Sequence, residues 1–264
     1  MSIAFIGGTG LYRLGGETRP RTVATPYGEA RVQVGRLADQ GVIFLPRHGP
    51  AHDVPPHAIN YRANLAALKQ LGVTMVVASS AVGTLSPRVR PGQLALLTDF
   101  IDQTSGRERT FFSDRVVHLD YTEPYCPSLR GALLAAADRC GLELVEGATY
   151  VCTNGPRFET PAEIRMYAAL GADVVGMTNL PEAVLAREAE LCYAAVAIGT
   201  NAAAGLSQER LTHGEVEEMM AARLADLCRL LAEFAAAPPT TDCSCRHALD
   251  EYRRRGGPEP WPAR

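Results

Sequence analysis

The chain has 264 residues, and 47% of them are hydrophobic, which is enough to bury the core of one sizeable α/β domain or of two small ones. Its formal net charge of −3 gives no electrostatic reason to expect nucleic acid or an anionic membrane as a partner. The start lacks the basic and apolar regions of a signal peptide, and no stretch approaches the roughly eighteen apolar residues of a membrane span, so a cytoplasmic protein is predicted.

Short apolar runs alternate with helical patterns along the chain, and this alternation is typical of an α/β sheet domain. The segment 60–71 places its apolar positions on one face and is predicted to be a helix. The predicted strands lie over 3–6, 41–45, 74–78, 94–101, 173–177 and 194–200.

Two later helices carry explicit start signals. Thr160 is followed by a proline at the first helical position and by Glu163, which together predict a capping box. Thr212 and Glu215 repeat that spacing before the amphipathic stretch 216–234. We therefore expect helices to begin directly after Thr160 and Thr212.

The composition changes near the carboxyl end, which predicts a body over 1–237 and a tail rich in Pro, Gly and Arg over 238–264. The sequence leaves open whether this tail is disordered or packs on a neighbouring subunit. Cys243 and Cys245 lie in the tail close to His247, but two thiols and one imidazole fall short of a closed tetrahedral metal site. The other cysteines lie in apolar contexts typical of reduced core thiols, and no metal is predicted.

A glycine-rich turn over 7–10 follows the first strand. It does not complete the G-x-G-x-x-G dinucleotide pattern, because Arg13 stands where the third Gly is required. The turn is either a tight structural turn or a small anion nest, in which glycine backbone N–H groups approach a phosphate and Thr9 adds a hydroxyl donor.

Further phosphate ligands are expected where strands end. Arg47 and His48 follow the strand over 41–45, and a fixed cation beside an imidazole suits an oxyanion. Ser80 and Thr178 follow two other predicted strands, so together these residues predict a phosphate site assembled from distant segments. His48 and His52 have a metal-ligand spacing, but Gly and Pro break the helix between them and no Glu follows His48, which argues against zinc.

Three residues have ordinary local explanations when each is considered alone. Phe158 fits a core position, Glu159 fits a first-turn acid that favours the helix dipole, and Asn201 fits a turn after a strand. The chain contains no G-x-S-x-G elbow, so a hydrolase triad has no candidate nucleophile.

Taken in order, the motifs resemble the trimeric purine nucleoside phosphorylase and methylthioadenosine phosphorylase superfamily over roughly residues 3–234. A series of this kind is more specific than any single motif. The matching stretches are Ile-Gly-Gly-Thr-Gly-Leu at 6–11, Arg-His-Gly at 47–49, Asn-Tyr-Arg-Ala-Asn at 60–64, Ala-Val-Gly-Thr-Leu at 81–85, Gly-Pro-Arg-Phe-Glu-Thr at 155–160 and Gly-Met-Thr-Asn-Leu-Pro-Glu at 176–182.

The resemblance implies a three-layer αβα fold with a mixed, partly barrel-like central sheet. It implies reversible phosphorolysis of a purine nucleoside to the free base and ribose 1-phosphate, as in purine salvage, with inorganic phosphate as co-substrate and neither cofactor nor metal. It also implies a homotrimer, with a hexamer left open, in which His118 is the residue we place across the subunit interface.

The resemblance also assigns roles residue by residue. His48 and Asn201 are the expected catalytic residues, Met177 contacts the ribose, Phe158 packs on the purine ring, and Glu159 binds the base edge together with Asn201. The expected phosphate ligands are Thr9, Arg47, His48, Ser80, Ala81 through its backbone, and Thr178.

Two features distinguish branches of the family. Methylthioadenosine phosphorylases typically carry Asp at the positions of Asn201 and Ala203 and a small residue at that of Glu159, whereas the residues present here resemble the 6-oxopurine branch. His213 resembles the residue that meets the 5′-hydroxyl in ordinary nucleoside phosphorylases. The stretch 60–64 is nearer the methylthio branch, so phosphorolysis of S-methyl-5′-thioinosine or S-methyl-5′-thioadenosine is the alternative.

Overall fold

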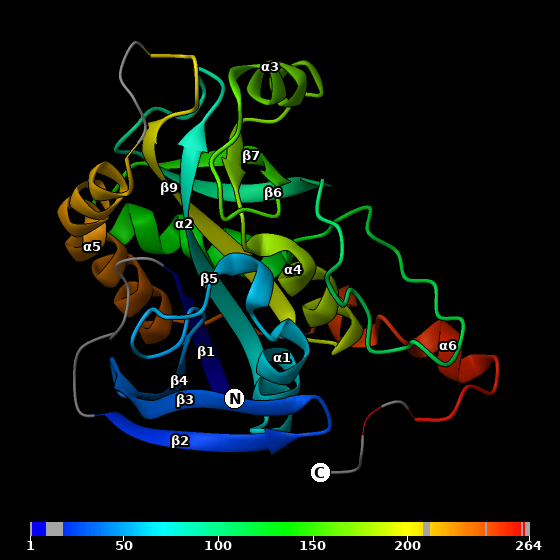
Figure 1. The fold of residues 1–264 in the computed structure, drawn as a ribbon. Coiled ribbons are helices and arrows are strands. Elements are labelled where there is room, and N and C mark those ends of the chain that lie inside the picture. Colours follow the sequence, from blue (N-terminus) through cyan, green and yellow to red (C-terminus); the bar gives the residue numbers. More distant parts are fainter. Residues whose placement is uncertain (1, 9–17, 208–211, 241, 260, 262–264) are drawn as a thin grey trace.

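The structure is a computed structural model that describes residues 2–8, 18–207, 212–240, 242–259 and 261. Within these residues the chain forms a nine-stranded sheet in the order β2-β3-β4-β1-β5-β8-β7-β6-β9, and a further pairing of β5 with β9 closes the last five strands into a barrel (Figure 1). The strands are β1 (Ser2–Gly7), β2 (Thr18–Thr25), β3 (Gly28–Leu37), β4 (Gln40–Pro46), β5 (Val73–Thr84), β6 (Leu94–Asp102), β7 (Leu144–Cys152), β8 (Val174–Gly176) and β9 (Cys192–Ala202).

The sheet is mixed, as predicted. Strand β1 runs parallel to β4 and β5, whereas β2, β3 and β4 form an antiparallel meander. In the barrel, β5 pairs in parallel with β9, and antiparallel pairings of β5 with β8 and of β6 with β9 complete the ring with two further parallel pairs. The prediction of a mixed, partly barrel-like sheet is therefore confirmed.

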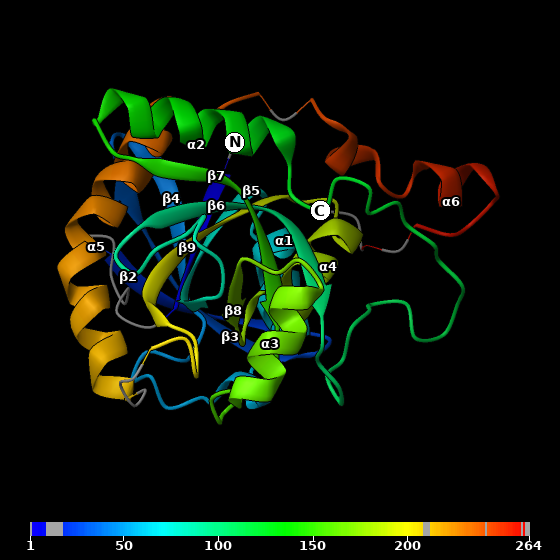
Figure 2. The ribbon, with the colours of Figure 1, turned by 90° about the horizontal axis from the view of Figure 1, so that it is seen from above.

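Helices cover both faces of the sheet (Figure 2). Along β1, Ile3 and Phe5 belong to one buried core, whereas Ala4 and Ile6 belong to another. Because successive side chains of a strand point to opposite faces, each face needs its own covering layer. The first core includes residues of α2 (Pro127–Arg139) and α5 (His213–Ala236), and the second includes residues of α1 (Tyr61–Gln70) and α4 (Asn179–Glu188). This arrangement is the predicted three-layer architecture.

Polar side chains cap three helix starts, and two of these caps were predicted. The side chain of Asn60 accepts a hydrogen bond from the backbone of Ala63 and caps α1. Thr160 and Thr212 each form the complete capping box, before α3 (Pro161–Ala169) and α5 respectively. The predicted helix starts are confirmed. No helix among the described residues is both long and apolar enough to cross a membrane.

The described part of the tail folds back onto the body of its own chain. It contains two short helical segments, η2 (Ser244–His247) and α6 (Asp250–Arg254). The label η1 belongs to a 3₁₀ turn in the body, at Pro56–Ala58. Arg253 donates to both carboxylate oxygens of Glu190 at 2.7 Å, and Trp261 packs edge-on against Phe111 with ring centroids 4.7 Å apart. The division of the chain at residue 237 remains a prediction.

Candidate active site

A cavity of about 540 Å³ opens beside the ends of β1 and β4 and along β5, β8 and β9. It brings together most of the residues that the sequence analysis singled out, although they come from segments far apart in the chain. The predicted residues that line it are Arg47, His48, Ser80, Ala81, Phe158, Glu159, Met177, Thr178, Asn201 and Ala203.

Three further predicted residues are not among those that line the cavity in the described part of the chain. Thr9 lies outside the described residues, although its neighbour Gly8 lines the cavity. The side chain of His213 also lies outside the described part of the structure, but His213 begins α5, and Val216, one helical turn later, lines the cavity. His118 is exposed on the connection between β6 and α2 and is not part of the lining.

Arg47 is held by a carboxylate that the sequence analysis did not identify. Its Nε and Nη2 groups each donate to one carboxylate oxygen of Glu182 on α4 at 2.7 Å, and its Nη1 donates to the carbonyl oxygen of Ser79 at 2.9 Å. Both charged side chains are fully buried. Burial alone would lower the pKa of Arg47, but the charge and hydrogen bonds of Glu182 raise it above the ordinary value, so the guanidinium stays charged.

The pair continues into a buried polar network behind the cavity. Tyr193 donates its hydroxyl to Glu182 at 2.7 Å, and Asn179 donates to the Tyr193 oxygen at 3.1 Å. Tyr125 in turn donates to the amide oxygen of Asn179. Each member has a partner, and satisfied buried networks of this kind fix the positions of their members. Glu182 is thereby fixed, and so is the plane of the Arg47 guanidinium.

Among the described residues, this geometry leaves part of the guanidinium without a partner. A guanidinium has five N–H groups, and the contacts with Glu182 and Ser79 use three of them. A Cβ atom at Gly8 would lie 3.0 Å from Nη1 of Arg47, closer than nearly all real contacts, so a larger residue there would crowd the charged group. Glycine at position 8 therefore keeps space open beside Arg47.

His48 is neutral at neutral pH. Burial and the adjacent Arg47 charge lower its pKa to about 4, although the contact of Nδ1 with the Val54 carbonyl oxygen at 2.9 Å opposes that shift. A carbonyl oxygen only accepts, so Nδ1 carries the hydrogen and Nε2 is left as an acceptor. The His48 ring packs against the ring of His52, with the two centroids 4.7 Å apart, and His52 also lines the cavity.

Two hydroxyl groups meet at the same end of the cavity. Ser80 and Thr178 are buried, with their hydroxyl oxygens 3.5 Å apart. Ser80 was expected just after a strand, but β5 continues to Thr84 because it pairs with β9 on one side and with β8 on the other. Thr178 does follow β8, at the N-cap position of α4.

The other part of the lining carries an aromatic ring, a carboxyl group and an amide. Phe158 is 38% exposed, a large exposure for an aromatic side chain, and Glu159 accepts a hydrogen bond from the Thr153 hydroxyl at 2.7 Å. Burial raises the pKa of Glu159, and the Thr153 contact acts in the opposite direction. Phe158 thus presents an apolar ring to the cavity instead of filling the core.

Asn201 lies near the end of β9 and is anchored by its neighbours. Its amide oxygen accepts from the Thr200 hydroxyl at 2.7 Å, and its amide nitrogen donates to the Ala202 carbonyl oxygen at 2.9 Å. An amide nitrogen carries two hydrogens, so one N–H remains for another acceptor. Asn201 can therefore act as an oriented donor in the cavity.

The cavity thus has cationic and hydroxyl donors in one part and an aromatic ring with polar edge groups in another. Sequence reasoning found these groups but missed Glu182, the last residue of the motif over 176–182. The available signal was that Arg47, a cation predicted at a strand end, needs a carboxylate partner when it is buried. Such a lining can hold an oxyanion beside a flat heteroaromatic molecule.

Comparisons with known proteins agree with this geometry. Residues 2–236 match the family described as the Phosphorylase superfamily. A 6-oxopurine nucleoside phosphorylase of Pyrococcus furiosus is 51% identical over 257 residues, covering 94% of this chain and 97% of that relative. A "Probable S-methyl-5'-thioinosine phosphorylase" of Methanopyrus kandleri is 49% identical over 252 residues, with coverage of 94% and 97%. The solved structure of methylthioadenosine phosphorylase from Schistosoma mansoni in complex with adenine is 34% identical, with a TM-score of 0.86 and coverage of 89% of this chain and 91% of that chain.

Replacing Glu182 with Gln should be strongly destabilising, because it leaves the Arg47 charge buried without its counter-ion. We expect the free energy of unfolding in urea to fall by about 3–5 kcal/mol. The matched control is Glu251→Gln, which breaks the exposed ion pair with Arg255 and should cost less than about 1 kcal/mol. Equal losses in the two variants would show that the buried pair has no special importance.

The low pKa of His48 should make the fold sensitive to acid. The unfolded chain takes up a proton on this ring near pH 6.5, whereas the folded chain does so only near pH 4. The contribution of His48 to the free energy of unfolding is therefore fully present well above pH 6.5. It falls by roughly 3 kcal/mol as the pH drops through this window. His48→Asn should lose this component of the decline between about pH 7 and about pH 4, measured by urea unfolding. Parallel curves for the two proteins would contradict the assignment.

Proposed function

The chain belongs to the phosphorylase superfamily, and on that premise we propose that it cleaves 6-oxopurine nucleosides such as inosine and guanosine by reversible phosphorolysis. The products are the free base and ribose 1-phosphate, a step of purine salvage. The observation that carries the proposal is one cavity that combines the paired cation Arg47 with the aromatic, carboxyl and amide groups of Phe158, Glu159 and Asn201. Inorganic phosphate is the co-substrate, and the proposal includes neither a cofactor nor a catalytic metal.

We assign phosphate binding to the end of the cavity at Arg47. The two N–H groups that Glu182 and Ser79 leave over can form charge-assisted hydrogen bonds to phosphate oxygens. Neutral His48 offers Nε2 as an acceptor for the P–OH of a phosphate dianion, which a protonated ring would not do. The remaining proposed ligands are the hydroxyl groups of Thr9, Ser80 and Thr178 and the backbone N–H of Ala81.

The proposed reaction needs one bond to form and one to break at the ribose. A phosphate oxygen attacks C1′, the bond from C1′ to the purine N9 breaks, and the departing base takes up a proton. The sugar is cation-like in between, so an oriented anion on one face and a stabilised leaving group on the other lower the barrier. Asn201 would supply that stabilisation by donating to N7 of the purine, and Met177 would contact the ribose.

The choice of base follows from donors and acceptors. A 6-oxopurine presents an N1–H group that the Glu159 carboxylate can accept, and O6 and N7 acceptors to which the spare Asn201 N–H can donate. A 6-amino group would present its own N–H to the Asn201 donor and leave buried groups unpaired. Ala203 adds no charge at the position where an acid would favour adenine.

A second candidate differs only at the 5′ end of the nucleoside. His213 would provide a polar partner for a 5′-hydroxyl, which favours inosine and guanosine. Val216, however, gives the cavity an apolar side chain one turn further along α5, and a thioether would fit against it. Phosphorolysis of S-methyl-5′-thioinosine is therefore the alternative, and the same base contacts apply to it.

The proposal extends to a cytoplasmic homotrimer in which His118 reaches the cavity of a neighbouring subunit. Two observations support it: His118 is exposed and does not line the cavity of its own chain, and nearby Val116 is 77% exposed, as expected for a loop that another subunit covers. Light scattering of the pure protein would give the mass of the assembly, and a monomeric mass would remove His118 from the site.

The function is tested by initial rates of base release from inosine, guanosine and adenosine, each with and without inorganic phosphate. We expect release to require phosphate and 6-oxopurines to be preferred over adenosine by on the order of 10⁴ in kcat/KM. Asn201→Asp should shift activity towards adenosine while lowering it overall. Base release at the same rate without phosphate would contradict phosphorolysis, and equal rates on inosine and adenosine would contradict the roles of Glu159 and Asn201.

The 5′ end is tested by comparing inosine with S-methyl-5′-thioinosine on the wild type and on His213→Val. If His213 meets the 5′-hydroxyl, the wild type prefers inosine and the variant prefers the thioether, with a swing of roughly 1–3 kcal/mol. Measured kcat/KM ratios that are the same in both proteins would remove His213 from the site and favour the methylthio substrate.

A further inference from the structure

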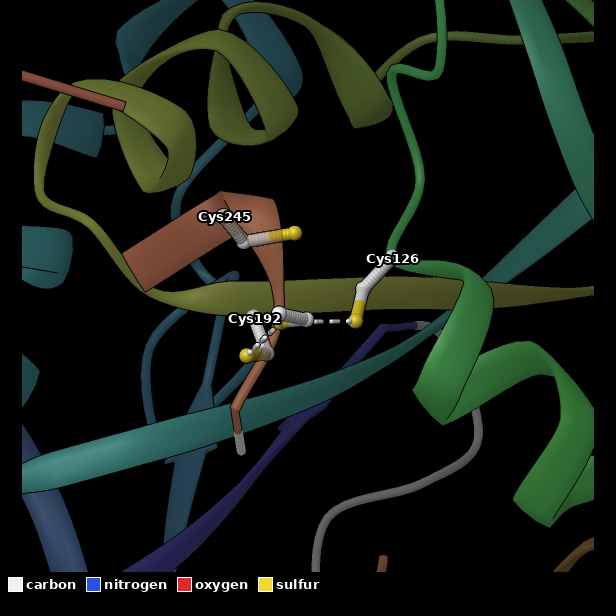
Figure 3. A group of neighbouring side chains, drawn as sticks. Cys126, Cys192 and Cys245 are labelled. Atoms are coloured by element: carbon white, nitrogen blue, oxygen red, sulfur yellow. Dashed lines mark hydrogen bonds between the residues drawn. The ribbon is translucent and has the colours of Figure 1, made fainter. Parts of the chain in front are cut away.

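Four cysteines gather at a point remote from the cavity. Cys126 is the N-cap residue of α2, Cys192 begins β9, and Cys243 and Cys245 belong to the tail. Figure 3 shows the sulfur atoms of Cys126, Cys192 and Cys245 facing a common centre from these three segments. None of the four lines the proposed active site.

The sulfur atoms are spaced as ligands of one ion. Sγ of Cys243 lies 3.7 Å from that of Cys126 and 3.2 Å from that of Cys192, and all four sulfurs lie within 4.8 Å of one another. Four thiolates at about 2.3 Å from a central Zn²⁺ in a tetrahedron are roughly 3.8 Å apart. A disulfide would need a separation of about 2.05 Å.

We propose that Cys126, Cys192, Cys243 and Cys245 bind one structural Zn²⁺ ion. Four protein thiolates complete the tetrahedral shell, so no position is left for water or substrate, which distinguishes a structural from a catalytic zinc site. On binding, the ion replaces the thiol protons, which pass to solvent. The proposal is independent of the proposed function, because the cluster and the cavity share no residue.

The surroundings suit such a centre. Cys126, Cys192 and Cys245 are each at most 1% exposed and belong to the apolar core under α2 and α5. A zinc ion with four thiolates carries a net charge of −2, which needs compensation when buried. The buried Arg187 interacts electrostatically with Cys245, and Cys126 lies at the amino end of α2, where the helix dipole favours negative charge.

The proposed site differs from the expectation drawn from the tail alone. His247 does not belong to the cluster, and its Nδ1 contacts Asp250 at 3.1 Å on the exposed side of the tail. The two further thiols come instead from the body, with Cys126 117 residues before Cys243 in sequence. A zinc ion here would fasten the tail to both α2 and β9.

Metal analysis of the full chain tests the proposal. We expect about one zinc per chain after purification without chelators, and loss of that zinc in Cys243→Ser. Cys228→Ser is the matched control, because Cys228 lies on α5 outside the cluster, and it should keep the metal. Replacing zinc with Co²⁺ in the reduced wild type should produce the thiolate charge-transfer absorption of a tetrahedral sulfur site, a readout that needs no variant to fold.

Three results would overturn the proposal. One is a reduced wild type that holds neither zinc nor cobalt. Another is a Cys243→Ser variant that keeps as much zinc as the wild type. The third is a cluster joined as two disulfides, in which case only Cys140, Cys152 and Cys228 would react with a thiol reagent in denaturant without reductant.

Discussion

A buried guanidinium requires a counter-ion, and Arg47 has it in Glu182, 135 residues further along the chain. That pairing constrains much of the molecule. It holds the loop after β4 against α4, connects through Tyr193 to β9, and would be crowded by a side chain at Gly8. Burying an ion pair costs desolvation energy, so such a pair adds little net stability. Its main effect is to fix the positions of the two side chains. Here the imposed position is that of a charged group facing the cavity.

The closed barrel explains how distant residues share one site. Strand β5 pairs with β1, β8 and β9, so Ser80 on β5, Thr178 after β8 and Asn201 on β9 are brought to the same cavity by backbone hydrogen bonding. These side chains therefore stand on a rigid frame and not on free loops. A phosphate and a purine placed there would meet preorganised donors. Such donors stabilise the charges of a transition state without having to reorganise during the reaction.

Sequence reasoning reached the fold and most of the lining because short motifs report local chemistry: capping boxes at Thr160 and Thr212, and polar residues after buried strands. It missed β2, β3 and β7. The residues of β2 are mostly exposed and only Val23 is buried, so no apolar run marks this strand. It also missed Glu182 and the four-cysteine cluster. Both depend on contacts between residues far apart in the chain, and no local pattern encodes which carboxylate or thiol will be the partner.

The fate of the phosphate tests the central claim most directly. The purified chain would be incubated with inosine and inorganic phosphate, and the mixture followed by ³¹P NMR while hypoxanthine is measured in parallel. If the cavity at Arg47 holds the nucleophile, the phosphate signal is replaced by that of ribose 1-phosphate, mole for mole with the hypoxanthine released. Hypoxanthine release with free ribose and an unchanged phosphate signal would contradict it.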